Sequence, residues 1–323
     1  MKVLITGASG FVGRHLAVYL AAGDFEVHGT HRGDRPPEVP GVHWHRTSLS
    51  DPDAGLRDAV AGAGTIVHLA ALAHQIGSHN GRRAAEFRRV NVGITRTVAR
   101  CAAELGADRV VFMSSVAAIG ARSRLAVNDE TVCTPVDDYG RSKLEAEAVL
   151  RTELEGSRTD WCVLRPPLIY GPGNPGNMER LQKLVATGLP LPLAAVRNRR
   201  SFIFIDNLVA AIETVIRYPE PIRSCFVLSD GSEFSTPELI RSMARAAARD
   251  VRLFSVPVGL LRVAGRVGDV LRRVTGVSIG VDSYSVDRLV SSFEVDGRRF
   301  NTTFHWHPPV PPGRALESLG APR

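Results

Sequence analysis

The sequence lacks several features, and each absence excludes a class of protein. Its four cysteines, Cys101, Cys133, Cys162 and Cys225, form no CxxC pair and have no histidine at metal-ligand spacing, which argues against a disulfide framework and a zinc site. No apolar run approaches the roughly 18 residues of a membrane span, and no basic leader precedes the first apolar run. We therefore expect a cytoplasmic protein with reduced thiols, no metal and no membrane contact.

Lysine is also scarce, because only three of the forty basic residues are lysines, namely Lys2, Lys143 and Lys183. A lysine next to other reactive residues therefore stands out. The net charge of +7 comes from arginines scattered along the whole chain, not gathered in one helix or tail. We expect a small anionic ligand and no nucleic acid.

Strand-like apolar runs alternate with helix-length segments in the first half of the chain. The expected strands span residues 3–6, 25–30, 65–69, 109–114 and 161–164, and the expected helices span residues 11–22, 53–61, 82–105 and 138–154. Alternation with continuously apolar strands is typical of a parallel sheet covered on both faces. The predicted fold is a doubly wound α/β domain over residues 1–165, a Rossmann arrangement that binds dinucleotides.

The pattern changes after a segment rich in proline and glycine at residues 165–177. We expect residues 166–323 to form mainly a smaller substrate-binding lobe, with some segments returning to the first domain. Strands are expected at residues 201–205 and 225–228. Residues 256–275 form an amphipathic pattern, and we expect its apolar side to pack on the lobe; that side comprises Leu260, Leu261, Ala264, Val267, Val270 and Leu271.

Three glycines follow the first strand and open the first helix. Gly7, Gly10 and Gly13 are spaced as GxxGxxG, where backbone amides and a helix N-terminus hold a dinucleotide pyrophosphate. The tip of the second strand carries His31 and Arg32, and a basic side chain there favours the 2′-phosphate of NADP. NAD remains the alternative if Arg32 is merely solvated.

Tyr139 and Lys143 lie four residues apart on an expected helix, so both side chains emerge on one face. An adjacent ammonium favours phenolate, and we therefore expect Lys143 to lower the pKa of Tyr139 toward a working value. Ser115 follows the strand at residues 109–114, at the sheet edge where ligands bind. Ser115 would hold the reacting oxygen, Tyr139 would transfer the proton, and nicotinamide would exchange hydride.

With these residues the chain resembles the extended short-chain dehydrogenase/reductase family, in its nucleotide-sugar epimerase, dehydratase and reductase branch. Five motifs match in order: GASGFVG, VHLAA, VNVGIT, SSVAAIG through YGRSK, and LRPPLIYGPG. The resemblance implies cofactor contacts from Gly7, Gly10, Phe11, Val12, Gly13, His31, Arg32, Ser48, Leu49, Leu69, Ala70, Ala71, Asn91, Tyr139, Lys143 and Pro166.

The same resemblance implies a nucleotide-diphosphate sugar as substrate. Arg200, in RRSFIFIDNL, would pair with the diphosphate, while Asn177, His74 and Ser115 would contact the sugar nucleotide. The arginine that usually closes over the diphosphate has no clear match, and Arg288, Arg298 or Arg299 could replace it. The chain departs from the family at Ser48, Ala117, Ile119 and Leu168, where relatives often carry an acidic residue, a serine or threonine, a tyrosine and an asparagine.

The sequence therefore predicts an oxidoreductase acting at C4 of a nucleotide sugar. An NADP-dependent 4-ketoreductase is the main hypothesis and a UDP-hexose 4-epimerase the alternative. A 4,6-dehydratase is disfavoured because residues 116–118 are apolar. A reductase of other carbonyl compounds and a non-catalytic NADP sensor are weaker alternatives. The family often dimerises through two long helices, so we expect a homodimer through residues 82–105 and 138–154.

Overall fold

A computed structural model describes residues 1–50, 54–73, 81–120, 125–174, 177–275 and 282–318. Its larger sheet has seven parallel strands in the order β3-β2-β1-β4-β5-β6-β9. The strands are β1 (Lys2–Thr6), β2 (Glu26–His31), β3 (Val42–Arg46), β4 (Thr65–His68), β5 (Arg109–Met113), β6 (Asp160–Arg165) and β9 (Ser224–Val227). The order reverses direction between β1 and β4, which creates the crevice where doubly wound sheets bind ligands.

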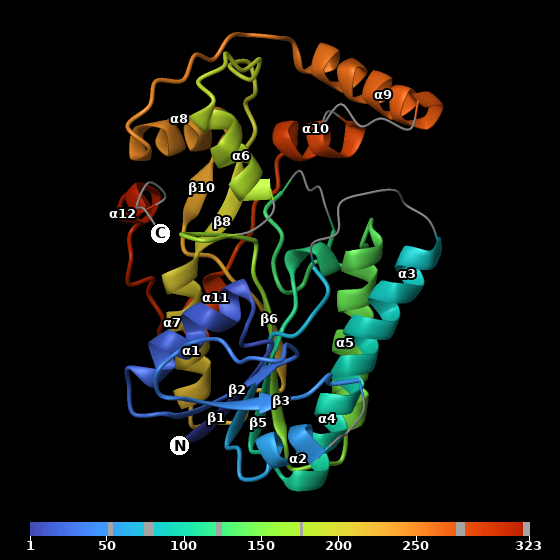
Figure 1. The fold of residues 1–323 in the computed structure, drawn as a ribbon, viewed down its shortest axis with the longest axis vertical. Helices are drawn as coiled ribbons and strands as arrows, with labels where there is room; N and C mark the ends of the chain where they lie inside the picture. Colours follow the sequence, from blue (N-terminus) through green and yellow to red (C-terminus); the bar gives the residue numbers. More distant parts are fainter. Residues whose placement is uncertain (51–53, 74–80, 121–124, 175–176, 276–281, 319–323) are drawn as a thin grey trace.

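Helices cover both faces of this sheet (Figure 1). One face carries α1 (Phe11–Ala21) and α7 (Ile205–Arg217), and the other carries α2 (Ala54–Val60), α4 (Gly93–Leu105) and α5 (Asp138–Leu154). Every residue of β4 and β5 is buried, including the polar Thr65, His68 and Arg109, as expected for strands covered by helices on both faces. The predicted doubly wound α/β fold is confirmed.

The long helix expected over residues 82–105 is divided into three helical segments. They are α3 (Gly81–Phe87), a π-helical turn η1 (Arg88–Val92) and α4. The π turn buries Asn91 and Val92. Single π turns inside helices often occur at functional sites, and this one lies in the predicted VNVGIT motif.

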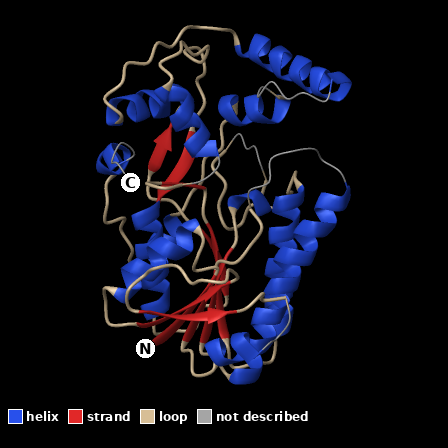
Figure 2. Cartoon of the chain, viewed as in Figure 1, coloured by secondary structure: helices blue, strands red, loops and turns tan. Residues whose placement is uncertain are grey.

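A smaller lobe follows β6 and contains a three-stranded sheet in the order β10-β8-β7 (Figure 2). Its strands are β7 (Leu168–Tyr170), β8 (Arg200–Phe204) and β10 (Ser232–Phe234). The other helices are α6 (Asn177–Ala186), α8 (Thr236–Ala246), α9 (Val258–Thr275), α10 (Ser283–Val290), α11 (Arg298–Thr303) and α12 (Pro312–Glu317). Because β9 lies next to β6 in the larger sheet, the chain enters the lobe and returns. The boundary at residue 165 stays a prediction.

The helix α9 packs differently from the sequence prediction. Leu260, Val263, Val267, Val270 and Leu271 are exposed, each by at least 41%. Its contact with α10 instead uses the opposite side, where Gly265 lies against the backbone of Ser283. Leu261 of the predicted apolar side packs against the core. The prediction is wrong for the rest of that side, because the glycine face allows the closer approach to α10.

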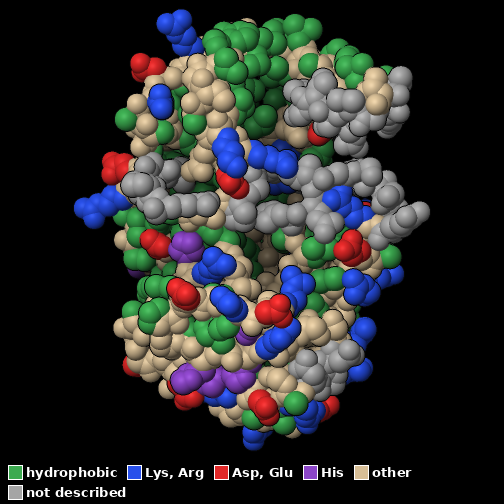
Figure 3. All heavy atoms as spheres, in the orientation of Figure 1, with side chains coloured by type: hydrophobic (Ala, Val, Ile, Leu, Met, Phe, Trp, Pro, Cys, Tyr) green, Lys and Arg blue, Asp and Glu red, His purple; other side chains and the backbone are tan. Residues whose placement is uncertain are grey.

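Basic and acidic side chains are interspersed over the face of the molecule in Figure 3. All four cysteines are free thiols; Cys101 and Cys162 are buried, while Cys133 and Cys225 are partly buried. Among the described residues no group of histidine, cysteine and carboxylate side chains could hold a metal ion.

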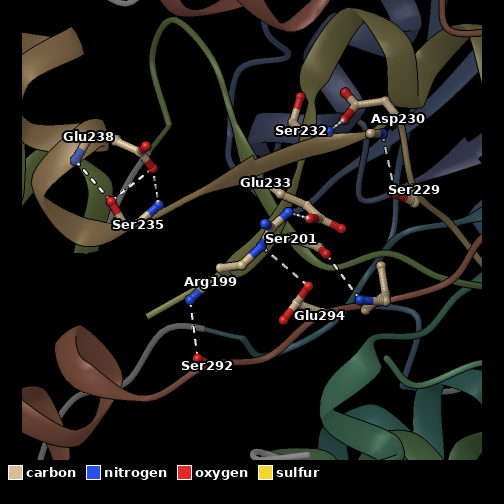
Figure 4. Close-up of polar contacts among 12 residues, drawn as sticks. Arg199, Ser201, Ser229, Asp230, Ser232, Glu233, Ser235, Glu238, Ser292 and Glu294 are labelled. Atoms are coloured by element: carbon tan, nitrogen blue, oxygen red, sulfur yellow. Dashed lines mark hydrogen bonds and ion pairs between the residues drawn. The ribbon is translucent and has the colours of Figure 1, made fainter. Parts of the chain in front are cut away.

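Polar contacts tie the segment after α10 to the smaller sheet (Figure 4). Arg199 forms ion pairs with Glu233 of β10 and with Glu294, and its amide donates to the Ser292 hydroxyl at 3.1 Å. The amide of Val295 donates to the Ser201 hydroxyl at 3.0 Å. These contacts fix the position of α10 relative to β8.

Candidate active site

The glycine loop after β1 has no room for a side chain at Gly7 or Gly13. Gly7 has a φ of +70°, and a Cβ added there would lie 2.8 Å from the Ala70 Cα. A Cβ on Gly13 would lie 2.3 Å from the carbonyl oxygen of Gly7. The first turn of α1 therefore packs directly on the loop, and the loop packs directly on the backbone after β4. This is the geometry that lets backbone amides approach a pyrophosphate.

The tip of β2 combines a buried imidazole with exposed charges. His31 is buried, and no partner of its Nδ1 is found among the described residues. Arg32 is exposed, and beyond it Asp34 accepts a hydrogen bond from Arg46 at 2.7 Å. A ribose hydroxyl would satisfy the buried nitrogen, because an unpaired buried polar atom is costly. The residues present thus fit an adenine dinucleotide.

The segment after β3 and the edge after β4 hold other expected cofactor residues. Leu49 is buried with a φ of 61°, and its amide donates to the Thr47 hydroxyl at 3.1 Å, while Ser48 is exposed. The amide of Leu69 donates to the carbonyl of Thr6 at 3.2 Å. These contacts place both segments next to the carboxyl end of the large sheet. His74 lies outside the described residues.

The structure brings Ser115 and Tyr139 together. Ser115 caps the short 3₁₀ helix η2 (Val116–Ala118), and its hydroxyl accepts a hydrogen bond from the amide of Ala117 at 3.2 Å. The phenol of Tyr139, in the first turn of α5, lies close enough to the Ser115 hydroxyl for that side chain to favour the phenolate and so to act against the rise in the Tyr139 pKa. A Cβ on Gly140 would lie 2.2 Å from the Ala117 carbonyl oxygen. Glycine at this position is what allows α5 to approach η2.

Burial is the main influence on the pKa values of Tyr139 and Lys143. Removal from water raises the pKa of Tyr139 to about 12, although the Ser115 side chain acts in the opposite direction. Removal from water also lowers the pKa of Lys143 to about 7, against the attraction of Glu147. The prediction that Lys143 lowers the pKa of Tyr139 is therefore wrong for the protein alone, because burial of the phenol outweighs the opposing effect of the Ser115 side chain.

A buried network anchors the middle of α5. Glu147 is fully buried and accepts hydrogen bonds from Arg165 Nε at 2.9 Å, Arg165 Nη2 at 2.5 Å and the Ser114 hydroxyl at 2.5 Å. The sequence prediction missed this network. A signal was present, since Glu147 follows Lys143 by one helical turn and Arg165 ends an otherwise apolar strand.

His68 is the last residue of β4 and lies near Lys143. The Thr95 hydroxyl donates to the carbonyl of Asn91, so it can accept from His68 Nε2 at 3.1 Å. His68 Nδ1 is then the acceptor for the Thr6 hydroxyl at 2.6 Å. Burial lowers the pKa of His68 to about 3. A neutral imidazole avoids repulsion of the nearby Lys143 ammonium.

Asn91 and Pro166 connect the site to the framework. Asn91 Oδ1 accepts the amide hydrogen of Leu72 at 2.7 Å, and Asn91 Nδ2 donates to the Ser142 hydroxyl at 2.9 Å. The carbonyl of Pro166 accepts a hydrogen bond from the Val116 amide at 3.1 Å. Asn91 thus joins the loop after β4 to α5, beside Lys143.

Arginines approach the site from the smaller lobe. Arg200 starts β8, and its Nη1 donates to the carbonyl of Arg288 at 2.9 Å. Burial, followed by the charge of Arg288, lowers the pKa of Arg200 to about 10. The Arg288 charge also reaches Tyr139. Two cations held this close form a site that an anion would stabilise.

The other two candidate arginines are engaged elsewhere. Arg298 forms an ion pair with Asp296, and Arg299 Nη2 donates to the Ser224 hydroxyl at 2.8 Å. Of the three alternatives left by the sequence, only Arg288 contacts Arg200. Asn177 is the first residue of α6, and its contacts lie outside what the structure describes.

The chain is similar to known proteins along most of its length. It is 31% identical over 318 residues to the UDP-glucose 4-epimerase of Vibrio cholerae, with 95% of this chain and 91% of that protein covered. It is 27% identical over 306 residues to the N-acetyl-alpha-D-glucosaminyl-diphospho-ditrans,octacis-undecaprenol 4-epimerase of Escherichia coli O157:H7, with coverage of 94% and 89%.

Solved structures share the fold. MoeE5, in a complex with UDP-glucuronic acid and NAD, superposes with a TM-score of 0.76 at 22% identity, covering 98% of this chain and 97% of that one. The model of the NAD dependent epimerase/dehydratase family matches residues 3–226, from β1 through the third residue of β9. The chain therefore belongs to the NAD dependent epimerase/dehydratase family.

Proposed function

We propose that this protein is an NAD-dependent 4-epimerase of a UDP-linked hexose. The observation that carries the proposal is the approach of α5 to η2, which brings Tyr139 next to Ser115, with Lys143 one turn along α5. The names of the relatives support epimerisation at C4. The 4-ketoreductase, the main hypothesis from the sequence, gains no comparable support.

NAD is the proposed cofactor, since MoeE5 was solved with NAD. The predicted preference for NADP rested on Arg32 and gains no support from these relatives. A bound NAD would supply the hydride acceptor and donor for the sugar C4. The glycine loop would hold the pyrophosphate and His31 the adenosine ribose, with Lys143 reaching the other ribose.

The residues of this chain would move the proton. Ser115 would donate a hydrogen bond to the C4 oxygen, and Tyr139 would take the hydroxyl proton and later return it. With a pKa of about 12, the Tyr139 phenol is protonated at pH 7 and suited to the return step. The removal step requires phenolate, so positive charge must increase near Tyr139 when the ligands bind.

The substrate diphosphate would lie against Arg200 and Arg288. Burial and then the charge of Arg288 lower the pKa of Arg200, and an anion there would offset the second of these effects. This contact would orient the sugar from the side of the smaller lobe, leaving C4 near Tyr139. Arg288 is thus proposed as the closing arginine for which the sequence offered three alternatives.

The predicted homodimer is retained as a proposal. Helices α4 and α5 lie side by side on one face of the sheet (Figure 1), and Arg100 of α4 pairs with Glu153 of α5 at 2.8 Å. Two copies of such a helix pair would form a four-helix bundle.

The test is turnover of UDP-glucose, UDP-N-acetylglucosamine and UDP-glucuronic acid, followed by NMR of the sugar ring protons. We expect a mixture of C4 epimers without net consumption of NADH or NADPH. Tyr139→Phe should lower kcat by about 10²–10⁴-fold while cofactor binding persists. Stoichiometric oxidation of NADPH with a 4-keto sugar would instead establish the reductase, and full activity of Tyr139→Phe would refute the mechanism.

A further inference from the structure

The helix α9 presents an apolar stripe to solvent. The stripe consists of Leu260, Val263, Val267, Val270 and Leu271, whose exposed fractions are 59%, 52%, 50%, 55% and 41%. Their spacing of three and four residues places them on one face of the helix. Phe254, in the segment before α9, is 48% exposed. Figure 3 shows hydrophobic side chains gathered at this end of the molecule. An apolar surface of this kind on a soluble protein usually marks a binding site.

The orientation of α9 is fixed by its contact with α10. A Cβ added to Gly265 would lie 3.0 Å from the Ser283 Cα, so the two backbones are in close contact. Arg262 pairs with Asp287 of α10 at 3.5 Å. On an ideal helix Gly265 lies roughly opposite the centre of the stripe. The stripe therefore points away from the lobe and cannot turn inward without breaking this contact.

The charges of α9 are unbalanced. Its sequence contains four arginines, Arg262, Arg266, Arg272 and Arg273, and one carboxylate, Asp269. Asp269 accepts a hydrogen bond from the amide of Ser283 at 3.4 Å, which places it on the side facing α10. Arg266 is exposed, and the contacts of the described residues give it no acidic partner. The solvent side of α9 thus combines an apolar stripe with positive charge.

We propose that α9 binds the surface of an anionic lipid bilayer. The helix would lie in the plane of the interface, with the stripe among the acyl chains and Arg266 among the phosphates, as basic amphipathic helices do. Across the described part of the chain, no helix has both the length and the apolar character needed to cross a bilayer. The contact is therefore peripheral, and it departs from the expectation of no membrane contact drawn from the sequence.

Charge favours a lipid surface over a second copy of the chain. If two α9 helices met along their stripes, two helices with the same excess of arginine would be brought together, and like charges would repel. Anionic headgroups would instead attract Arg266, which is exposed on α9. The chain as a whole also carries a net charge of +7. This proposal does not depend on the proposed epimerase activity.

The experiment is co-sedimentation of the full chain with vesicles of phosphatidylcholine alone or mixed with phosphatidylglycerol. We expect binding to the mixed vesicles that weakens as salt is added. Val267→Glu should weaken this binding by about tenfold or more, because binding scales with the apolar area inserted. The matched control is Val18→Glu, a valine of α1 that is 56% exposed and far in sequence from α9. It introduces the same charge and should bind as the wild type does.

Three results would overturn the proposal. The first is a wild type that stays in the supernatant with both kinds of vesicle, and the second is a Val267→Glu variant that sediments as well as Val18→Glu. The third is a dimer in sedimentation velocity that Val267→Glu converts to monomers, which would assign the stripe to a second copy. Circular dichroism of both variants checks folding independently of vesicle binding and of activity.

Discussion

Glu147 and Arg165 form a doubly hydrogen-bonded ion pair between α5 and the end of β6, with both side chains removed from water. The pair lies one helical turn beyond Lys143, and Ser114, the neighbour of Ser115, donates to the same carboxylate. Two segments that carry predicted catalytic residues are therefore joined through one carboxylate. We expect the loss of the Glu147 carboxylate to destabilise the fold more than it slows the reaction.

Glu147→Gln should lower the free energy of unfolding by about 3–5 kcal/mol, because the Arg165 cation would stay buried without its counter-charge. The matched control is Glu145→Gln on the same helix, where the carboxylate pairs with the exposed Arg88 at 2.8 Å. That change should stay within about 1 kcal/mol. Urea denaturation of both variants measures the difference. Equal losses would show that the buried pair has no special role in stability.

Arg200→Met should raise KM for a UDP-sugar by about tenfold or more and change kcat much less, since it removes a contact to a part of the substrate that does not react. Arg298→Met is the control, because Arg298 pairs with Asp296 at the surface and does not contact Arg200. Steady-state kinetics on both variants measure KM and kcat and so test whether Arg200 contacts the substrate. A purely structural role for Arg200 predicts a loss of stability with an unchanged KM.

Gly140→Ala should lower kcat, because the new methyl group would push α5 away from η2 and separate Tyr139 from Ser115. Crowding of this kind typically destabilises a protein by about 1–3 kcal/mol. Gly93→Ala in α4 is the control, since no atom lies within 4 Å of a Cβ added there. It should raise stability by roughly 0.5–1 kcal/mol. A Gly140→Ala enzyme with the kcat of the wild type would contradict this account.

Acid should destabilise the protein through His68. The pKa of His68 is about 3 in the fold and 6.5 as the ordinary value, so the unfolded chain takes up a proton first as the pH falls. The stability contributed by neutral His68 is complete above about pH 6.5 and decreases toward pH 3, by roughly 1.4 kcal/mol per pH unit.

His68→Gln removes this titration and gives the control for the acid effect. Urea denaturation at pH 7 and pH 5 should show a smaller acid loss for His68→Gln than for the wild type. The variant is expected to be less stable than the wild type at pH 7, because hydrogen bonds to Thr6 and Thr95 are disturbed. Identical acid losses would exclude His68 as the source.

The sequence predicted what depends on local pattern. The helix over residues 138–154 matches α5 at both ends, because Asp137 caps its first turn and the helical spacing is regular. The pair of Tyr139 and Lys143 depends only on that spacing. The pairing of Glu147 with Arg165 was missed, because the sequence marks both residues as unusual but does not show that their two elements become neighbours when the sheet assembles.

Two predictions from the sequence were wrong for physical reasons that the order of residues alone does not show. The pKa of Tyr139 depends on how far burial removes the phenol and Lys143 from water, which is a property of the folded site. The apolar side of α9 was assumed to face inward, whereas Gly265 gave α10 a closer contact on the other side. Neither outcome follows from the residues of one segment.

The return of the chain as β9 has a consequence for how this protein can evolve. β9 follows part of the smaller lobe in the sequence and lies beside β6 at the edge of the large sheet. The smaller lobe therefore cannot be removed as one terminal segment without losing a strand of the large sheet. A recombination that exchanged everything after residue 165 would also replace the strand that shields the edge of β6. An exchange of the smaller lobe would therefore have to retain β9, whereas substitutions around Arg200 and α10 leave the large sheet intact.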